Sequence, residues 1–331
     1  MTAVIAVDGG NSKTDLALVA ADGDLLSRVR GPGCSPHALG VSGSLDVVRA
    51  LLDQAIVDAG LGVTDLPLAT IGAFFLAGLD EPHEEVEYAS AVESTRWVER
   101  VVATNDTFAV LRAGTPRDWG VAVVCGAGMN ACGVDPSGRH GRYQALGALS
   151  GDWGGGEDVG LAAVGAAIRG NDGRGPATVL SRVVPERMGF AQAEDVADAV
   201  HKQRLSRSAL AGLAPDVFAA SRAGDAVAQR IVDRLADEVV AMSTALLRRL
   251  DLTGVETDVV LGGGLLQAGD QRLLSRATAG IHAVAPVAIV RPLSAPPLLG
   301  AIRAGLVAAG ADDAALSTVA RQLAANAESR P

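Results

Sequence analysis

The chain has 331 residues, of which 49% are apolar and only 3% aromatic, so Ala, Val and Leu must form most of the core. Its length allows two domains or one large domain. The formal net charge of −10 is opposite to the basic surplus of nucleic-acid-binding proteins, and no uninterrupted apolar run approaches the roughly 18 residues of a membrane span. We therefore expect neither a nucleic-acid partner nor a membrane partner.

The cysteines and the N-terminus indicate a cellular compartment. Cys34, Cys125 and Cys132 are too few, and odd in number, for a disulfide framework, so a reducing cytoplasm fits best. The opening MTAVIAVDGG lacks the basic region of a signal peptide, and its apolar stretch is too short. We expect a cytoplasmic protein.

The first part of the chain predicts alternating strands and helices. Residues 3–30 form an expected strand, glycine loop, strand, turn and strand, with the turn ADGD as a hairpin signal. Helical periodicity follows at 44–60, between Ser44 and Gly60. The next expected elements are a strand at 68–78, a helix at 84–97, a strand at 99–106 and a helix at 107–114.

From residue 119 the chain repeats the plan of its first 30 residues. A strand, a glycine loop, a strand, the turn DPSG and another strand come in the same order. The later expected elements are a loop at 151–156, a helix at 157–170, broken helical pattern at 172–229, a long amphipathic helix at 226–251, a strand before the glycines at 262–264, a strand at 287–292 and a helix at 296–310. A duplicated α/β architecture is the simplest account.

This duplication predicts two lobes. The N-terminal lobe is expected at 1–117, joined by a C-terminal helix at 305–331. The C-terminal lobe is expected at 118–304.

Three glycine-rich loops, at 9–10, 126–128 and 262–264, each follow an apolar strand. Glycine lets successive backbone N–H groups approach an anion closely, and ligands of α/β sheets bind beyond the carboxyl ends of strands. A single loop is as readily an ordinary tight turn. Three loops at equivalent places predict phosphate binding.

Two familiar nucleotide motifs do not fit these loops. DGGNSKTD does not match the Walker pattern. GAGMNA at 126–131 matches the dinucleotide fingerprint, but the chain continues there as a strand instead of opening a helix, which argues against a nicotinamide enzyme.

The residues around the first loop have an ordinary and a functional interpretation. Asp8 either caps the amides of the turn or holds Mg²⁺ through water. Lys13 is either a solvated residue or a point charge on a terminal phosphate, to which Ser12 and Thr14 could donate hydroxyls.

Two further acids follow the same logic. Asp106 either caps the next helix or accepts the proton of a substrate hydroxyl during phosphoryl transfer, and the two roles are compatible. Asp152 is either a turn residue or a bidentate ligand of sugar hydroxyls.

Together these motifs resemble the ASKHA superfamily (acetate and sugar kinases, Hsp70 and actin). Within it the chain is similar to the BadF/BadG/BcrA/BcrD ATPase family, especially its N-acetylglucosamine kinase branch. VDGGNSKTDLALVAADG and VVCGAGMNACGVDPSGR resemble the two phosphate motifs, TNDTFA the catalytic-aspartate segment, LGALSGDWGGGEDVG the sugar-site segment, VVLGGGLL the adenosine motif and PPLLGAIRAG the late connecting helix. The resemblance implies a duplicated ribonuclease H-like, actin/hexokinase-type two-lobe α/β fold with its active site in the interlobe cleft.

The resemblance also implies roles for individual residues. Asp106 would be catalytic and Asp8 the metal ligand, with ATP and Mg²⁺ as cofactors. The ATP and phosphate ligands would be Gly9, Gly10, Asn11, Ser12, Lys13, Thr14, Gly126, Ala127, Gly128, Gly262, Gly263, Gly264 and Gln267. The sugar ligands would be Ser35, His37, Gly78, Asn105, Asp106, Met129, Asn130, Gly147 and Asp152.

Two departures from the family pattern concern the substrate. The second phosphate loop usually reads Gly-Thr-Gly-Ser in this branch, but here it reads Gly-Ala-Gly-Met, ending at Met129. Ser35 stands where the family carries an asparagine for sugar hydroxyls. An acetyl group calls for an apolar contact such as Met129, whereas a free amine calls for a carboxylate.

The expected function is an ATP-dependent kinase that converts N-acetylglucosamine to its 6-phosphate, acting as a homodimer. Glucosamine or another hexose is the alternative substrate. An alternative of another class is an ATPase that activates a partner enzyme, like the activators of 2-hydroxyacyl-CoA dehydratases. Those carry an iron–sulfur cluster, for which Cys125 and Cys132 are poorly spaced.

Overall fold

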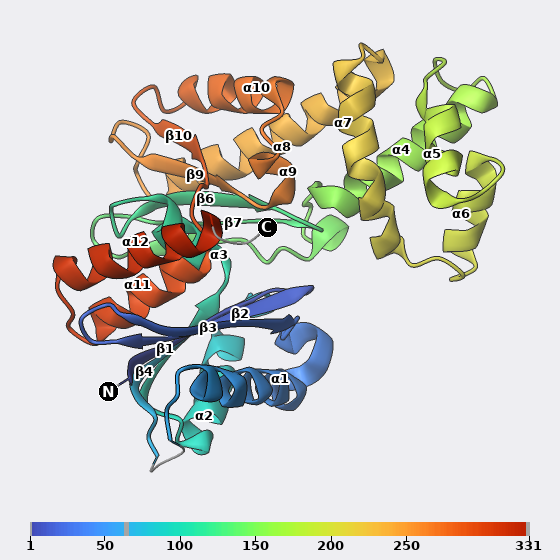
Figure 1. The fold of residues 1–331 in the computed structure, drawn as a ribbon. Helices are drawn as coiled ribbons and strands as arrows, with labels where there is room; N and C mark the ends of the chain where they lie inside the picture. Colours follow the sequence, from blue (N-terminus) through green and yellow to red (C-terminus); the bar gives the residue numbers. More distant parts are fainter. Residues whose placement is uncertain (1, 63–65, 329–331) are drawn as a thin grey trace. The chain divides into compact units, whose positions relative to one another are not determined.

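The computed structural model describes residues 2–62 and 66–328 (Figure 1). Contacts divide these residues into two compact units. The first comprises the described parts of Met1–Gly120, Cys132–Gly138 and Leu293–Pro331, and the second comprises Val121–Ala131 and Arg139–Pro292.

The first unit is built on a five-stranded sheet with the order β3-β2-β1-β4-β5. Its strands are β1 (Thr2–Gly9), β2 (Lys13–Ala20), β3 (Leu25–Pro32), β4 (Ala69–Leu76) and β5 (Val98–Asn105). β1, β2 and β3 form antiparallel pairs, whereas β1, β4 and β5 run parallel. The carboxyl ends of the three parallel strands therefore meet at one edge, where Gly9 pairs with Leu76 and Leu76 with Asn105.

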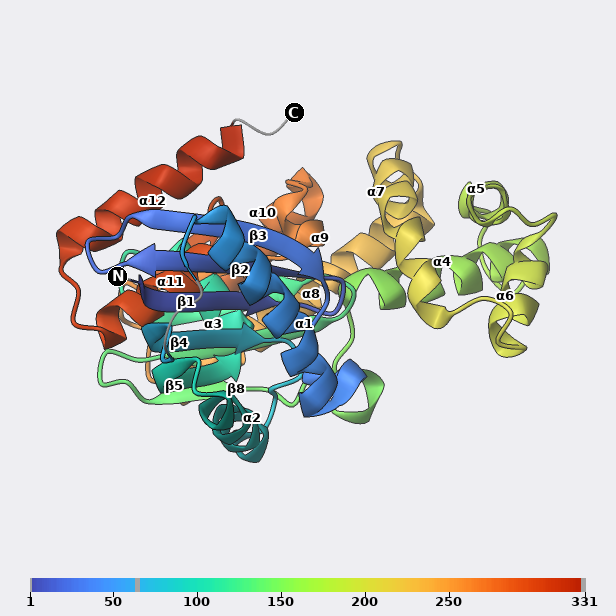
Figure 2. The ribbon, with the colours of Figure 1, turned by 60° about the horizontal axis from the view of Figure 1, so that its bottom comes forward.

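Helices cover both faces of this sheet (Figure 2). α1 (Pro36–Asp58) and α2 (Pro82–Thr95) pack on the face that carries Ile5 and Val7. α11 (Leu298–Ala308) packs on the other face beside α3 (Thr107–Gly114), because glycines let it approach closely. An added Cβ at Gly305 would collide with Val4, and one at Gly300 with the carbonyl oxygen of Ala109.

The C-terminal segment differs from the expected single helix at 305–331. It forms two helices, α11 and α12 (Asp313–Glu328), separated by a turn in which Gly310 has φ +81°. The segment 293–304, expected in the second lobe, makes its contacts in the first unit because α11 packs on β1 and α3.

A second five-stranded sheet repeats the strand order of the first. It runs β10-β9-β6-β7-β8, and β6, β9 and β10 are parallel. Its strands are β6 (Gly120–Cys125), β7 (Met129–Val134), β8 (His140–Arg142), β9 (Asp258–Gly262) and β10 (Ile289–Pro292). When β6, β7, β8, β9 and β10 are matched in chain order to β1, β2, β3, β4 and β5, the two sheets have the same strand order. The predicted duplication is therefore confirmed.

Helices make up most of the rest of the second unit. They are α4 (Gly155–Asn171), α5 (Leu180–Met188), α6 (Ala193–His201), the 3₁₀ helix η2 (Arg207–Leu213), α7 (Ala214–Arg222), α8 (Ala226–Arg249), α9 (Gly264–Gln267) and α10 (Gln271–His282), and a further 3₁₀ turn, η1, spans Gly147–Leu149. None of the helices within the described part of the chain has the length and apolarity needed to cross a membrane.

Two predicted helix starts were wrong. The first helix begins at Pro36 rather than at residue 44, because Pro36 opens a short turn that a kink at Gly40 (φ 69°) separates from the main helix. α4 begins inside the predicted loop 151–156, at Gly155. Glycines are poor helix formers, but they start this helix because it packs closely against loop 126–128.

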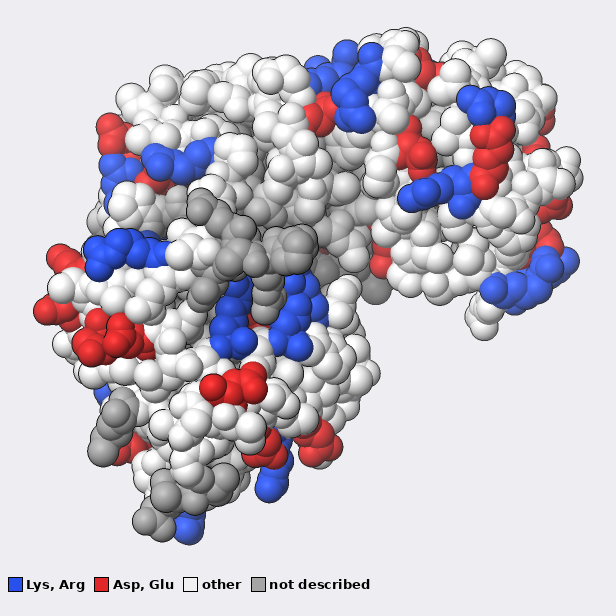
Figure 3. All heavy atoms as spheres, viewed as in Figure 1, with Lys and Arg blue, Asp and Glu red and all other residues white. Residues whose placement is uncertain are grey.

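Surface charges are of both signs on the face that Figure 3 shows, with basic and acidic side chains interspersed. Some form ordered pairs. Arg272 contacts Asp233 and Arg276 contacts Asp237, each at 2.6 Å, and these two pairs join α10 to α8.

Candidate active site

Two acids lie close together at the carboxyl edge of the first sheet. Asp8 is the penultimate residue of β1, and Asp106 directly follows β5. Loss of hydration and the neighbouring charge of Asp106 raise the pKa of Asp8 to about 8. Loss of hydration and the charge of Asp80 raise the pKa of Asp106 to about 7. A carboxyl with such a pKa can accept a proton near neutral pH.

The side chain of Asn105, and not that of Asp106, caps the start of α3. Its Oδ1 accepts hydrogen bonds from the backbone N–H of Thr107 at 3.0 Å and from Thr107 Oγ1 at 2.6 Å. Its Nδ2 donates to Asp80 at 2.8 Å. The buried side chain of Asn105 therefore fixes the start of α3 and holds Asp80 beside Asp106.

The first glycine loop is packed closely from behind. An added Cβ at Gly9 would collide with Cys34 Sγ and lie 2.5 Å from Leu76, and one at Gly33 would collide with the carbonyl oxygen of Asn11. Gly10 N–H donates to the carbonyl oxygen of Lys13 at 2.9 Å, which closes the turn.

Among the predicted phosphate ligands of this loop, Asn11, Ser12 and Lys13 are exposed. Thr14 is fully buried on the core side, opposite Gly9. The exposed tip of the loop is therefore available to a ligand, whereas the hydroxyl of Thr14 is enclosed by protein.

A cluster of charges borders Asp8 on the same face of the sheet. Asp15 lies opposite Asp8 in the pairing of β1 with β2. Its buried carboxylate accepts from Arg30 at 2.7 and 3.1 Å and from Arg28 at 3.2 Å. Lys13 and Arg30 favour the ionised form of Asp8, which burial, Asp106 and Asp15 oppose.

Three predicted sugar ligands of the first unit lie together. Gly78 has φ +84°, and an added Cβ there would lie 2.7 Å from His37 Cβ and 2.8 Å from Ser35 Oγ. Ser35 is 2% exposed, and its hydroxyl has no hydrogen-bond partner within residues 2–62 and 66–328. His37 is exposed. A buried hydroxyl without a partner is costly unless a ligand completes it.

The donor set at the first loop fits Mg²⁺. The described residues hold no group of three or more His, Cys, Asp or Glu side chains that could bind a metal ion by themselves. Mg²⁺ needs only one or two carboxylates, because it keeps several waters and binds substrate phosphates. Asp8 supplies one carboxylate at the base of an exposed loop, which matches this requirement.

In the second unit, the start of α4 is pressed against the second glycine loop. Gly156 N–H donates to Gly126 O at 2.8 Å, and Glu157 N–H donates to Ala127 O at 3.0 Å. Gly155 has φ +81°, and an added Cβ would lie 2.5 Å from the carbonyl carbon of Gly128. The glycines that start α4 are therefore required by this contact, and they fix the shape of loop 126–128.

The third glycine loop packs on the end of β6. Gly263 has φ +85°, and an added Cβ would lie 2.5 Å from the carbonyl carbon of Cys125. Gly262 is buried, whereas Gly264 and Gln267 are exposed at the start and end of α9. The second and third loops thus lie side by side.

The predicted sugar ligands of the second unit differ in burial and in hydrogen bonding. Met129 is 7% exposed, and its sulfur lies 2.6 Å from an added Cβ at Gly154, so its side chain packs inside the unit. Asn130 Oδ1 accepts from the backbone N–H of Ala131 at 2.7 Å. Asp152 is half-buried, its backbone N–H donates to Gly147 O at 3.0 Å, and its carboxylate accepts from Ser150 Oγ.

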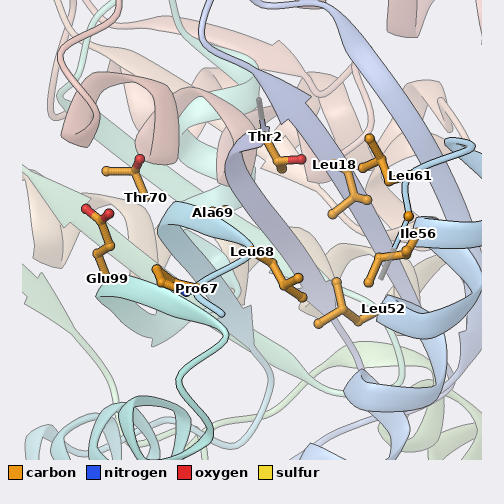
Figure 4. Close-up of a pocket in the computed structure, with 11 residues that line it drawn as sticks. Thr2, Leu18, Leu52, Ile56, Leu61, Pro67, Leu68, Ala69, Thr70 and Glu99 are labelled. Atoms are coloured by element: carbon orange, nitrogen blue, oxygen red, sulfur yellow. The ribbon is translucent and has the colours of Figure 1, made fainter. Parts of the chain in front are cut away.

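A separate pocket of about 380 Å³ lies at the opposite end of the first sheet (Figure 4). It is lined largely by aliphatic side chains near the amino ends of β1, β4 and β5: Thr2, Leu18, Leu52, Ile56, Leu61, Gly62, Pro67, Leu68, Ala69, Thr70 and Glu99. Ligands of parallel sheets bind at the carboxyl ends of strands, so this pocket is not the predicted site.

The geometry agrees with a family comparison. The model of the BadF/BadG/BcrA/BcrD ATPase family matches residues 5–290. The chain belongs to this family. The match spans all three glycine loops, Asp8, Asp106 and Asp152.

Curated relatives of this family member are sugar kinases. It is 27% identical over 269 residues to the N-acetylmuramic acid/N-acetylglucosamine kinase of Clostridium acetobutylicum. It is 26% identical over 284 residues to the N-acetyl-D-glucosamine kinase of Dictyostelium discoideum. Each alignment covers 80% of this chain and 86% of the relative.

A solved structure has the same fold. A candidate N-acetylglucosamine kinase from Chromobacterium violaceum superposes with a TM-score of 0.72 and 25% identity, covering 92% of this chain and 99% of that one. The likeness and the repeated five-stranded sheets confirm the predicted fold class, a duplicated two-lobe α/β fold of the ASKHA type.

Three charged residues near the candidate site were not among the predicted site residues. Asp80 beside Asp106, and Arg28 and Arg30 around Asp15, were not predicted. The alternation of Arg28 and Arg30 along one strand opposite Asp15 on the next is a signal that could have identified the ion pairs. The position of Asp80 has no comparable local signal, because it depends on the turn after β4.

Proposed function

We propose that this chain transfers the γ-phosphate of ATP to the 6-hydroxyl of N-acetylglucosamine. The names of two curated relatives support the substrate. The observation that carries the chemistry is Asp106, a half-buried acid with a pKa of about 7, beside Asp8 at the carboxyl edge of the first sheet.

Asp106 is the proposed catalytic base. Phosphoryl transfer passes through a loose transition state, so the base mainly orients the hydroxyl and accepts its proton as the bond to phosphorus forms. Asp80 and the loss of hydration keep the Asp106 carboxylate basic enough for this task.

Asp8 is the proposed Mg²⁺ ligand. When bound, Mg²⁺ would neutralise charge on the β- and γ-phosphates. Lys13 would contribute a point charge to the same phosphates, and the exposed Asn11 and Ser12 would donate hydrogen bonds.

The remaining ligands are assigned by their places in the two units. Loop 126–128 is proposed to bind phosphate, and Gly262 to Gly264 with Gln267 to contact adenosine. Ser35, His37, Gly78 and Asp152 are proposed to bind sugar. Asn105, Met129, Asn130 and Gly147 would shape that site. We propose that the two lobes close over both substrates, which excludes water as a competing acceptor.

The proposal includes a cytoplasmic homodimer. Support for the compartment comes from Cys34, Cys125 and Cys132, which are buried and free. Size-exclusion chromatography with light scattering would test the dimer.

An ADP-release assay tests the function. The panel is N-acetylglucosamine, glucosamine, N-acetylmannosamine, glucose and no sugar, each with MgATP. We expect ADP release to depend on sugar and to have its highest kcat/KM with N-acetylglucosamine. A higher kcat/KM with glucosamine or glucose would show that this sugar, and not N-acetylglucosamine, is the preferred substrate. Strong ADP release without sugar would support the ATPase alternative.

A further inference from the structure

One turn of α8 lies along the segment that carries Asp152. The guanidinium carbon of Arg234 lies 4.0 Å from the ring centre of Trp153. Leu235 Cδ1 lies 3.2 Å from an added Cβ at Gly154. Glu238 is close enough to Asp152 for the charge of Asp152 to raise its pKa. Arg234 and Glu238 are four residues apart, so they project from the same face of the helix.

The backbone of this segment is held on both sides of Asp152. Asp152 N–H donates to Gly147 O at 3.0 Å, and Gly154 N–H donates to Asp158 Oδ2 at 3.0 Å. Ser150 Oγ donates to the Asp152 carboxylate. The backbone is therefore set by local hydrogen bonds, whereas the charge around the carboxylate depends on α8.

Glu238 is a second carboxylate near Asp152. Glu238 accepts no hydrogen bond from any residue in 2–62 or 66–328. Burial, Asp152 and Asp237 raise the pKa of Glu238, and Arg234 opposes them. Asp237 is engaged by Arg276 through two hydrogen bonds of 2.6 and 2.9 Å. Arg234 is thus a cation that opposes the repulsion of Glu238 by Asp152 on this turn.

Tyr143, which directly follows β8, lies close enough to Asp152 for its charge to raise the Tyr143 pKa. Its hydroxyl donates to the Met242 carbonyl at 2.9 Å, and the Arg249 guanidinium lies 5.8 Å from its ring centre. Burial raises the pKa of Tyr143, so this phenol stays neutral near pH 7. Arg249 therefore contacts Tyr143, whereas Arg234 contacts Trp153, the residue next to Asp152.

We propose that Arg234 is a positioning residue for sugar binding, acting through Asp152. Its guanidinium stacks on the ring of Trp153 and opposes the charge of Glu238, and both contacts hold the Asp152 carboxylate in place as an acceptor for sugar hydroxyls. This inference rests on the proposed function, and it assigns to α8 a role in sugar recognition. Loss of Arg234 should weaken binding of the sugar without changing the handling of ATP.

Steady-state kinetics of Arg234→Met test the inference, with Arg230→Met as the matched control. Arg230 is an exposed arginine one turn earlier on α8 without a hydrogen bond or ion pair to any described residue. We expect Arg234→Met to raise the KM for N-acetylglucosamine by about tenfold, the scale of one weakened charged hydrogen bond. The KM for ATP and the melting temperature should stay close to wild type, and Arg230→Met should match wild type throughout.

A further readout separates positioning from a merely structural role. Adding Glu238→Gln to Arg234→Met should recover most of the sugar KM, because it removes the uncompensated neighbour of Asp152.

An unchanged sugar KM in Arg234→Met, equal effects of Arg230→Met, or no recovery in the double variant would overturn the inference. A wild-type protein that phosphorylates no sugar would instead overturn the proposed function, and this inference with it. An active wild-type kinase that is insensitive to Arg234 contradicts only the role of α8.

Discussion

Gly155→Ala tests whether the start of α4 shapes the second glycine loop, and Gly151→Ala is its matched control. The two glycines have similar backbone conformations, φ +81° and +85°. An added Cβ at Gly151 has no heavy atom within 4 Å, whereas one at Gly155 lies 2.5 Å from the carbonyl carbon of Gly128. The two substitutions therefore share the left-handed strain, about 1–2 kcal/mol, and differ only in the collision.

The collision has a calculable cost. Ordinary carbon contact begins at 3.4 Å, so the helix start must retreat from the loop by about 1 Å in a close-packed interior. This retreat weakens the hydrogen bonds from Gly156 to Gly126 and from Glu157 to Ala127. At about 0.5–1.5 kcal/mol each, their loss adds about 1–3 kcal/mol to the destabilisation by Gly155→Ala.

Thermal unfolding and ATP kinetics measure the outcome. Gly155→Ala should melt below Gly151→Ala by about 2–4 °C for each additional kcal/mol. It should also raise the KM for ATP, because loop 126–128 loses its support. Equal melting temperatures and equal ATP KM values in the two variants would refute the reasoning.

The remaining predictions concern the first unit. The acid limb of kcat/KM for the sugar should have an apparent pKa near 7, and Asp80→Asn should move it to lower pH by removing the charge that raises the pKa of Asp106; a limb that stays in place would exclude Asp80 as the cause. Ser35→Ala should raise the sugar KM while leaving the melting temperature unchanged or higher, because it removes a buried hydroxyl without a partner; a lowered melting temperature with normal KM would make Ser35 purely structural. Lys13→Ala should lower kcat/KM for ATP by about tenfold or more, the range of a lost charged contact, and Lys202→Ala, at an exposed lysine paired with Asp198, is the control; equal kinetics in the two variants would show that Lys13 is only a surface charge.

The strands and hairpins could be predicted from the sequence because neighbouring residues alone determine them. The alternation of apolar residues and the turns ADGD and DPSG define β1 to β3 and the equivalent β6 to β8. The glycine start of α4 was misread as a loop, since helix propensity disfavours glycine and only the contact with Gly128 explains it.

The contacts that the sequence patterns did not predict at the candidate site join residues that are distant in the sequence. Asp80 reaches Asp106 through Asn105, and Arg234 reaches Trp153 from a helix about eighty residues later. Neither approach has a periodicity or motif in the sequence. The protonation of Asp106 likewise depends on burial and on neighbouring charge, which only the folded chain determines.

The central claim is that Asp106 presents a sugar hydroxyl to the γ-phosphate. Its most direct test is transfer of γ-³²P from ATP to N-acetylglucosamine by wild type and by Asp106→Asn, with ATP binding measured on both. The account predicts labelled sugar 6-phosphate from wild type, and a loss of about 10²–10⁴-fold in Asp106→Asn with ATP affinity retained. Near-normal transfer by Asp106→Asn, or label released only as inorganic phosphate by wild type, would contradict it.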